Sequence, residues 1–195
     1  MVKTATKLDR TKLDRTEVVS AALDLVLREG PGALTMRRLA TDLDVGTPTI
    51  YWHVGSRDEL VAAVIRAQAE RFAERSVEGT TGRDRVLSAA RNIYAAAVEE
   101  RAVTSLAHQT GTSSLLLGRL EDALIAELQA AGLNSTGVHE ALRSILVVVT
   151  GALVLTLRDH TKHSTDRDEL VWSGCDLDVL TTATLRAVVD RHVHE

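Results

Sequence analysis

Hydrophobic residues recur at intervals of three and four along most of the chain, which is the spacing of amphipathic α-helices. At the N-terminal end the pattern divides into three short segments. Their inward positions are, in chain order, Val19, Ala22, Leu23 and Val26; Met36, Leu39, Ala40 and Leu43; and Ile50 and Val54. The pattern therefore predicts three short helices that share one small core.

Turn and capping residues set the ends of these helices. Asp44 stands at a turn position that favours a left-handed backbone. Thr47 is expected to be the N-cap of the third helix, with Pro48 in its first turn, where a missing N–H leaves no group unpaired. Gly55 ends that helix, and Ser56 with Glu59 forms a capping box for the next one.

The third helix carries aromatic side chains on the face opposite its apolar positions. At 100° per residue, Trp52 lies nearly opposite Ile50 and Val54, flanked by Tyr51 and His53. One interpretation is an ordinary aromatic pair in a small helical core. However, the helix already has two core residues, so we favour contact with a DNA duplex, whose major groove accepts apolar, hydroxyl and imidazole groups.

From about Arg15 to Ala63 the sequence resembles the DNA-binding domain of the TetR family of bacterial transcriptional repressors. The run Pro48-Thr49-Ile50-Tyr51-Trp52-His53-Val54 is especially close to the tetracycline-repressor branch. Asp44 stands where the family usually has Gly. The resemblance implies DNA contacts from the helix-turn-helix and from the backbone-binding Arg57. The residues expected to make them are Arg37, Thr47, Pro48, Thr49, Tyr51, Trp52, His53 and Arg57.

The pattern in the rest of the sequence predicts an all-α protein in which a helical bundle follows the helix-turn-helix domain. We expect a basic arm over 1–14, the DNA-binding domain over 15–63 with a linking helix to about 76, and a ligand-binding and dimerisation domain over 77–195. Glu78-Gly79-Thr80-Thr81-Gly82 predicts a loop. Helices are expected at about 83–100, 113–131, 134–159 and 176–193, with a shorter one near 103–109.

The 134–159 helix is apolar on every side over Ile145 to Val149, which one neighbouring helix cannot cover. We expect it to pack against its own core on one flank and against a second copy of the chain on another, as the family resemblance also implies. The residues expected at this homodimer interface are Ile145, Val148, Gly151, Leu185 and Val188. The alternative is a fully buried central helix in a monomer.

A small-molecule effector is expected from the family pattern, bound among the helices from 83 to 159. Polar residues within apolar helices are the candidate contacts, although such residues are often satisfied core groups. They are Asn92, Tyr94, His108, Gln109, Thr110 and Thr150. The resemblance does not name the effector.

Charge and composition fit a cytoplasmic regulator. The net charge is −4, but residues 1–60 contain nine Lys or Arg and nine Asp or Glu, so the excess of negative charge lies elsewhere. Five basic residues form an N-terminal arm that either contacts DNA or is solvated: Lys3, Lys7, Arg10, Lys12 and Arg15. The single Cys175 excludes an internal disulfide, and no signal or transmembrane segment is expected, since Ile145–Leu157 is too short to cross a membrane.

An enzyme is the alternative from another class. Acidic and imidazole side chains gather between the last two helices, where a solvated loop is the simpler interpretation. They are Asp159, His160, His163, Asp166 and Asp168. With no nucleophile elbow or phosphate-binding Gly-rich loop, we expect no catalysis, cofactor or metal site. The expected function is a ligand-released repressor of a palindromic operator; the alternative is an activator, or a regulator controlled by a protein partner.

Overall fold

The structure is a computed structural model, and it describes residues 13–158 and 176–193. The described residues are helical and contain no strand. The first group of elements, in chain order, is α1 (Arg15–Glu29), the short 3-10 helix η1 (Pro31–Ala33), α2 (Met36–Asp42), α3 (Thr47–Val54) and α4 (Arg57–Ala73). The second group is α5 (Gly82–Glu99), α6 (Arg101–Gln109), α7 (Ser113–Ala130), α8 (Ser135–Arg158) and α10 (Leu177–His192).

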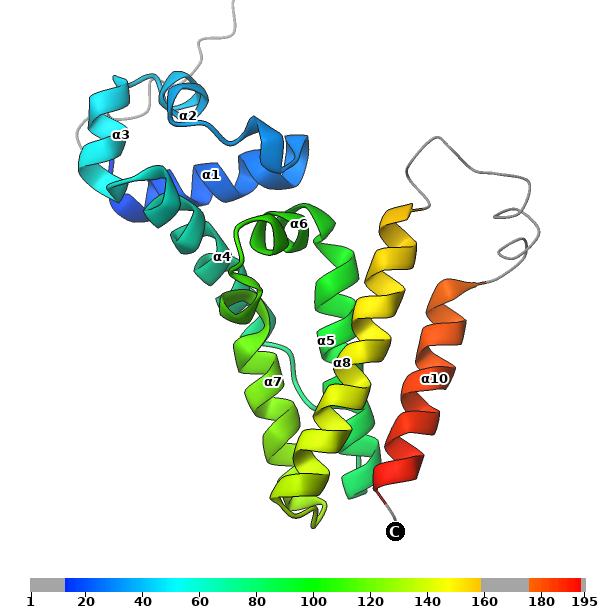
Figure 1. Cartoon of the computed structure of the whole chain (residues 1–195). Coiled ribbons are helices and arrows are strands. Elements are labelled where there is room, and N and C mark those ends of the chain that lie inside the picture. The colour runs from blue at the N-terminus through cyan, green and yellow to red at the C-terminus, as the bar shows by residue number, and fades with distance from the viewer. Residues whose placement is uncertain (1–12, 159–175, 194–195) are drawn as a thin grey trace, which may run out of the picture.

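The helices form two packed groups joined by α4 (Figure 1). Helix α1 packs on α3 and α4, while the far end of α4 contacts α7. In the second group α5 packs on α7, and α10 lies beside α8 and α5. One continuous set of buried apolar side chains runs from α1 through α4 to the bundle. The expected all-α architecture, a helix-turn-helix followed by a helical bundle, is therefore confirmed.

Local capping explains why the helices begin where they do. In α1 the Asp14 side chain accepts from the Glu17 N–H at 2.8 Å, and Glu17 accepts in return from the Asp14 N–H at 3.0 Å. Asn134 accepts from the Gly137 N–H at 2.9 Å at the start of α8. Such caps pair N–H groups that have no partner within the helix.

Helix α8 buries one face and exposes the other. Ile145 is fully buried and Val149 is 4 % exposed, whereas Val147 is 72 % and Val154 50 % exposed. Over Ser135–Thr156 the helix is long and apolar enough, by length and composition alone, to cross a membrane, with a mean hydropathy of 1.7 and 28 % of it buried. A core helix passes the same test, and here α7, α5 and α10 cover the inner face of α8.

This packing corrects the predicted placement of two residues at the dimer interface. Ile145 and Leu185 are both fully buried within a single protomer, so neither reaches a second copy. The pattern could not place them, because a helix that is apolar on every side does not reveal which side faces its own core. Val148 and Val188 are half-buried, and Gly151 is exposed.

Candidate nucleic-acid interface

The outer end of the molecule is formed by α2 and α3, which pack as a helix-turn-helix (Figure 1). Asp44 in the turn has a φ of 53°, which confirms the left-handed position predicted from the sequence. The turn is closed by the Val45 N–H, which donates to the Ala40 carbonyl at 2.9 Å. A tight connection of this kind fixes how α3 is presented.

The start of α3 differs by one residue from the prediction. Gly46, not Thr47, is the N-cap: its carbonyl accepts from the Thr49 N–H at 2.9 Å. Thr47 and Pro48 are both inside the first turn. Pro48 fits there because the first turn needs no donor from it. Thr47 is half-buried, whereas Pro48 is exposed.

Helix α3 directs its aliphatic side chains inward and its largest aromatic side chain outward. Ile50 is fully buried and Val54 is 3 % exposed, while Trp52 is 81 % and Tyr51 50 % exposed. The His53 ring lies edge-on to Trp52, with 4.6 Å between the ring centroids. An aromatic side chain so accessible in an otherwise aliphatic protein favours an interaction surface.

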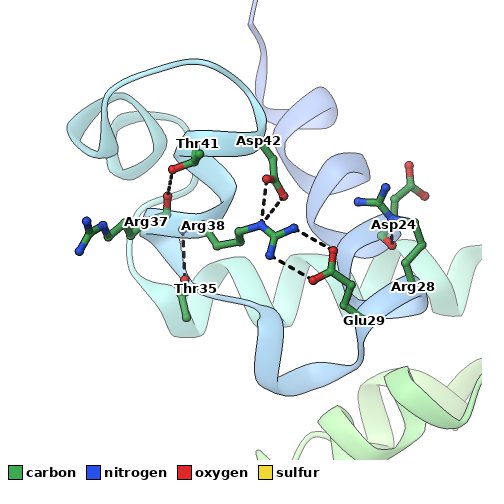
Figure 2. A network of polar contacts seen from close by, with 8 residues as sticks. All are labelled: Asp24, Arg28, Glu29, Thr35, Arg37, Arg38, Thr41 and Asp42. Carbon is green, nitrogen blue, oxygen red and sulfur yellow. Dashed lines mark hydrogen bonds and ion pairs between the residues drawn. The ribbon is translucent and has the colours of Figure 1, made fainter.

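Arginines frame this surface, and the structure separates two that are adjacent in sequence (Figure 2). The Arg38 guanidinium donates to Asp42 at 2.9 Å and to Glu29 at 2.8 Å, and these bonds raise its pKa, Asp42 contributing most. Arg37 points away from that network. Arg38 therefore ties α2 to the end of α1, whereas Arg37 is exposed and forms no ion pair with the residues that the structure describes.

Helix α4 starts beside this surface with a complete capping box. Ser56 accepts from the Glu59 N–H at 3.2 Å, and Glu59 accepts from the Ser56 N–H at 2.6 Å. The second bond is the main cause of a lowered pKa at Glu59. Arg57 is exposed in the first turn of α4. A guanidinium at this position suits a phosphate, which is also attracted to the helix N-terminus.

The predicted effector residues are not brought together. Asn92 donates to the Ser76 carbonyl at 2.9 Å, and the Tyr94 hydroxyl donates to Asp178 of α10. Thr150 is on the outer face of α8. The other three predicted effector residues are exposed. His108 and Gln109 end α6, and Thr110 is its C-cap. Their hydroxyl and amide groups are used locally, as when Thr110 donates to the Leu106 carbonyl at 2.8 Å.

A cavity of about 510 Å³ lies instead between the end of α4, the linker that follows it, α5 and α7. Of the six predicted residues only Asn92 lines it. The others in its lining are Ala73, Arg75, Val77, Ala89, Arg119, Leu120, Asp122 and Ala123. Arg119 and Asp122 share a face of α7 with Leu120 and Ala123. The spacing of these α7 residues is visible in the sequence. The sequence does not show that the end of α4, the linker and α5 lie opposite them.

The basic arm over residues 1–12, the cluster from Asp159 to Asp168 and Cys175 lie outside the described residues. Arg15 of the arm is exposed in the first turn of α1. Within residues 13–158 and 176–193, no group of three or more His, Cys, Asp or Glu side chains is arranged to hold a metal ion.

The first group of helices thus forms a helix-turn-helix domain with an exposed aromatic surface. Residues 18–64 match the family model described as bacterial regulatory proteins, tetR family. A helix-turn-helix transcriptional regulator of Saccharopolyspora erythraea is 38 % identical over 63 residues, covering 31 % of this chain and 27 % of that protein. The class D tetracycline repressor of Escherichia coli is 42 % identical over 53 residues, covering 27 % of this chain and 24 % of the repressor.

Solved structures extend the similarity to the bundle. The structure of Mycobacterium smegmatis BioQ is 25 % identical with a TM-score of 0.68, covering 93 % of this chain and 98 % of BioQ. A TetR variant from Acinetobacter baumannii in complex with minocycline is 24 % identical with a TM-score of 0.68, covering 94 % of this chain and all of that one, and it shows the shared fold.

Residues 18–64 of the chain are therefore a helix-turn-helix domain of the tetR type. The aligned segment spans only about a quarter of the length of the curated relatives, and that segment is the helix-turn-helix region.

Proposed function

We propose that the chain is a dimeric, DNA-binding transcriptional repressor that a small molecule releases from a palindromic operator. The observation that carries the proposal is α3 itself, whose aliphatic side is buried while Trp52 is 81 % exposed. In this proposal residues 15–63 bind DNA, and residues 77–195 bind the effector and a second copy of the chain. Helix α4 links these two parts. A structure of BioQ, which has this fold, contains its double-stranded DNA operator.

The proposed contacts divide into two roles. Trp52, Tyr51, His53, Pro48 and Thr49 face base edges and sugars from α3 in the major groove. Arg37 and Arg57 bind the phosphate backbone from the first turns of α2 and α4. Thr47 is half-buried in the first turn of α3, so we assign it to the edge of the interface.

Mobility shifts on an operator selected from random DNA test these roles. We expect Arg57→Ala to weaken binding to operator and unrelated DNA alike, and Trp52→Ala to reduce the preference for the operator by about 1–3 kcal/mol. Arg71→Ala is the matched control, because it removes an exposed arginine from the last turn of the same helix. Unchanged shifts for both Arg57→Ala and Trp52→Ala would exclude the proposed surface.

The effector is proposed to occupy the cavity between α4, α5 and α7. Its position supports this, because α4 runs from the cavity to the helix-turn-helix, so a change in the tilt of α4 alters the separation of two recognition helices in a dimer. Proteins of the same fold hold small molecules, minocycline in one and (S)-DNPA in ActR of Streptomyces coelicolor.

A cavity-filling variant tests the effector site once a releasing compound has been found by screening. Ala123 lines the cavity, so Ala123→Phe should abolish release by the compound and retain operator binding. Ala126→Phe is the control, since Ala126 is exposed on the same helix and outside the cavity lining. Equal release from both variants would place the compound elsewhere. The alternative, an activator or a regulator controlled by a protein, is distinguished by transcription assays with the selected operator.

A further inference from the structure

A second depression, of about 800 Å³, lies on the other side of the linker between α4 and α5. We call it the arginine groove, because four arginines line it: Arg75 from the linker, Arg83 and Arg91 from α5, and Arg186 from α10. Two acidic side chains, Glu78 and Asp84, also line it. The groove thus gathers positive charge in a chain whose net charge is −4.

Two of these arginines already have ionic partners. Arg75 pairs with Glu99, and Arg83 binds Asp190 of α10 through two nitrogens at 2.5 and 2.6 Å. These pairs hold the linker and α10 against α5, so they build the walls of the groove. Asp84, one of the two acidic side chains that line the groove, also pairs with Arg83 at 3.7 Å.

Arg91 and Arg186 form no ion pair with any described residue. The Arg91 Nε–H is buried and has no hydrogen-bond acceptor in the described part of the chain. A buried guanidinium donor without an acceptor is unfavourable, and proteins usually provide one. Arg186, exposed on α10, lines the same groove from the opposite helix.

The linker keeps the groove in shape. The Glu78 N–H donates to the Ser88 hydroxyl at 2.9 Å, and Asn92 donates to the Ser76 carbonyl at 2.9 Å. These bonds pin the linker along α5 one turn apart, on the face that carries Arg91. A ligand between Arg91 and Arg186 therefore meets a wall that is already ordered.

We propose that the arginine groove binds a small molecule bearing a phosphate or a carboxylate, whose oxyanion pairs with the guanidinium groups of Arg91 and Arg186. Guanidinium groups match such oxyanions geometrically and bind them through charge-assisted hydrogen bonds. The groove adjoins the proposed effector cavity, since Arg75 and Asn92 line both. The proposal does not depend on the DNA-binding role proposed above.

Isothermal titration calorimetry on the full chain tests the proposal, with inorganic phosphate in one arm and succinate in the other, each against chloride at matched ionic strength. We expect saturable binding of at least one probe, and the arm that binds identifies the oxyanion. Arg186→Gln should weaken that binding at least about tenfold, since a charge-assisted bond is lost. Arg91→Gln should weaken it similarly.

Arg191→Gln is the matched control, because it removes the same charge from an exposed position of α10 that does not line the groove. It should leave the affinity unchanged. Thermal unfolding without probe verifies that all variants are folded. Two results would overturn the proposal: no saturable binding of either probe, or equal weakening by Arg186→Gln and Arg191→Gln, which would indicate only a general charge effect.

Discussion

Gly55 is the C-cap of α3, two residues before the start of α4. Its φ is +76°, a conformation that side chains other than glycine rarely adopt, and a Cβ there would lie 2.1 Å from Glu59 Oε2. We predict that Gly55→Ala lowers the free energy of unfolding by about 1–3 kcal/mol, mostly through backbone strain. Urea unfolding measures it. Gly32→Ala is the control, since nothing lies within 4 Å of that position and its φ is ordinary; an equal loss there would refute the argument.

Arg37 and Arg38 are neighbours with opposite surroundings (Figure 2). Since Arg38 joins Glu29 and Asp42, we predict that Arg38→Ala lowers the melting temperature, and that added salt reduces the difference from the wild type. Arg37→Ala should leave the melting temperature unchanged and weaken binding to DNA. Thermal melts and mobility shifts on both variants check this. A larger stability loss in Arg37→Ala than in Arg38→Ala would contradict the roles assigned.

At the scale of elements, Tyr94 joins α5 to α10 through its hydrogen bond to Asp178. Burial, with this bond, raises the pKa of Tyr94 to about 12, above the ordinary value of 10.0. The stabilisation is complete below pH 10, where the phenol is protonated in both states. It is lost as the pH rises toward 12, because the unfolded chain ionises first.

Tyr94→Phe should therefore cost about 1 kcal/mol at pH 8. The stability gap to the wild type should narrow between pH 10 and 12, because the variant has no phenol to ionise. Urea titrations at several pH values measure the gap. Tyr51→Phe is the control at pH 8: its side chain is half exposed, so no loss is expected. A gap that stays constant up to pH 12 would exclude the link between α5 and α10.

Elements whose signals are local could be predicted from the sequence. The capping box of α4 and the turn at Asp44 each depend on residues within a few positions. The orientation of α3 was also predictable, because Ile50 and Val54 define its inner side. In contrast, which residues line the proposed effector cavity depends on packing between helices that are distant in the sequence. Arg75 and Arg119 line one cavity from α4–α5 and α7, and no spacing in the sequence shows that they meet.

At the scale of the whole molecule, the outer face of α8 is apolar and exposed. It forms an apolar groove of about 800 Å³, where Val147 and Val154 flank Gly151. Nothing lies within 4 Å of a Cβ built on Gly151, so a second helix can approach closely there. We propose a second copy of the chain rather than a lipid surface, because two-fold pairing also presents two recognition helices to a palindromic operator.

We predict that sedimentation velocity gives twice the chain mass of 21.1 kDa for the wild type and a single chain mass for Val147→Asp, because a carboxylate in an apolar interface is strongly unfavourable. Since Val147 is 72 % exposed in one protomer, the variant should stay folded. Leu115→Asp, at an exposed position of α7, should remain dimeric. On DNA the monomeric variant should bind single half-sites only, and its full-operator affinity should fall to the half-site value. A dimeric Val147→Asp, or a monomeric wild type with full operator affinity, would rule out this face as the interface.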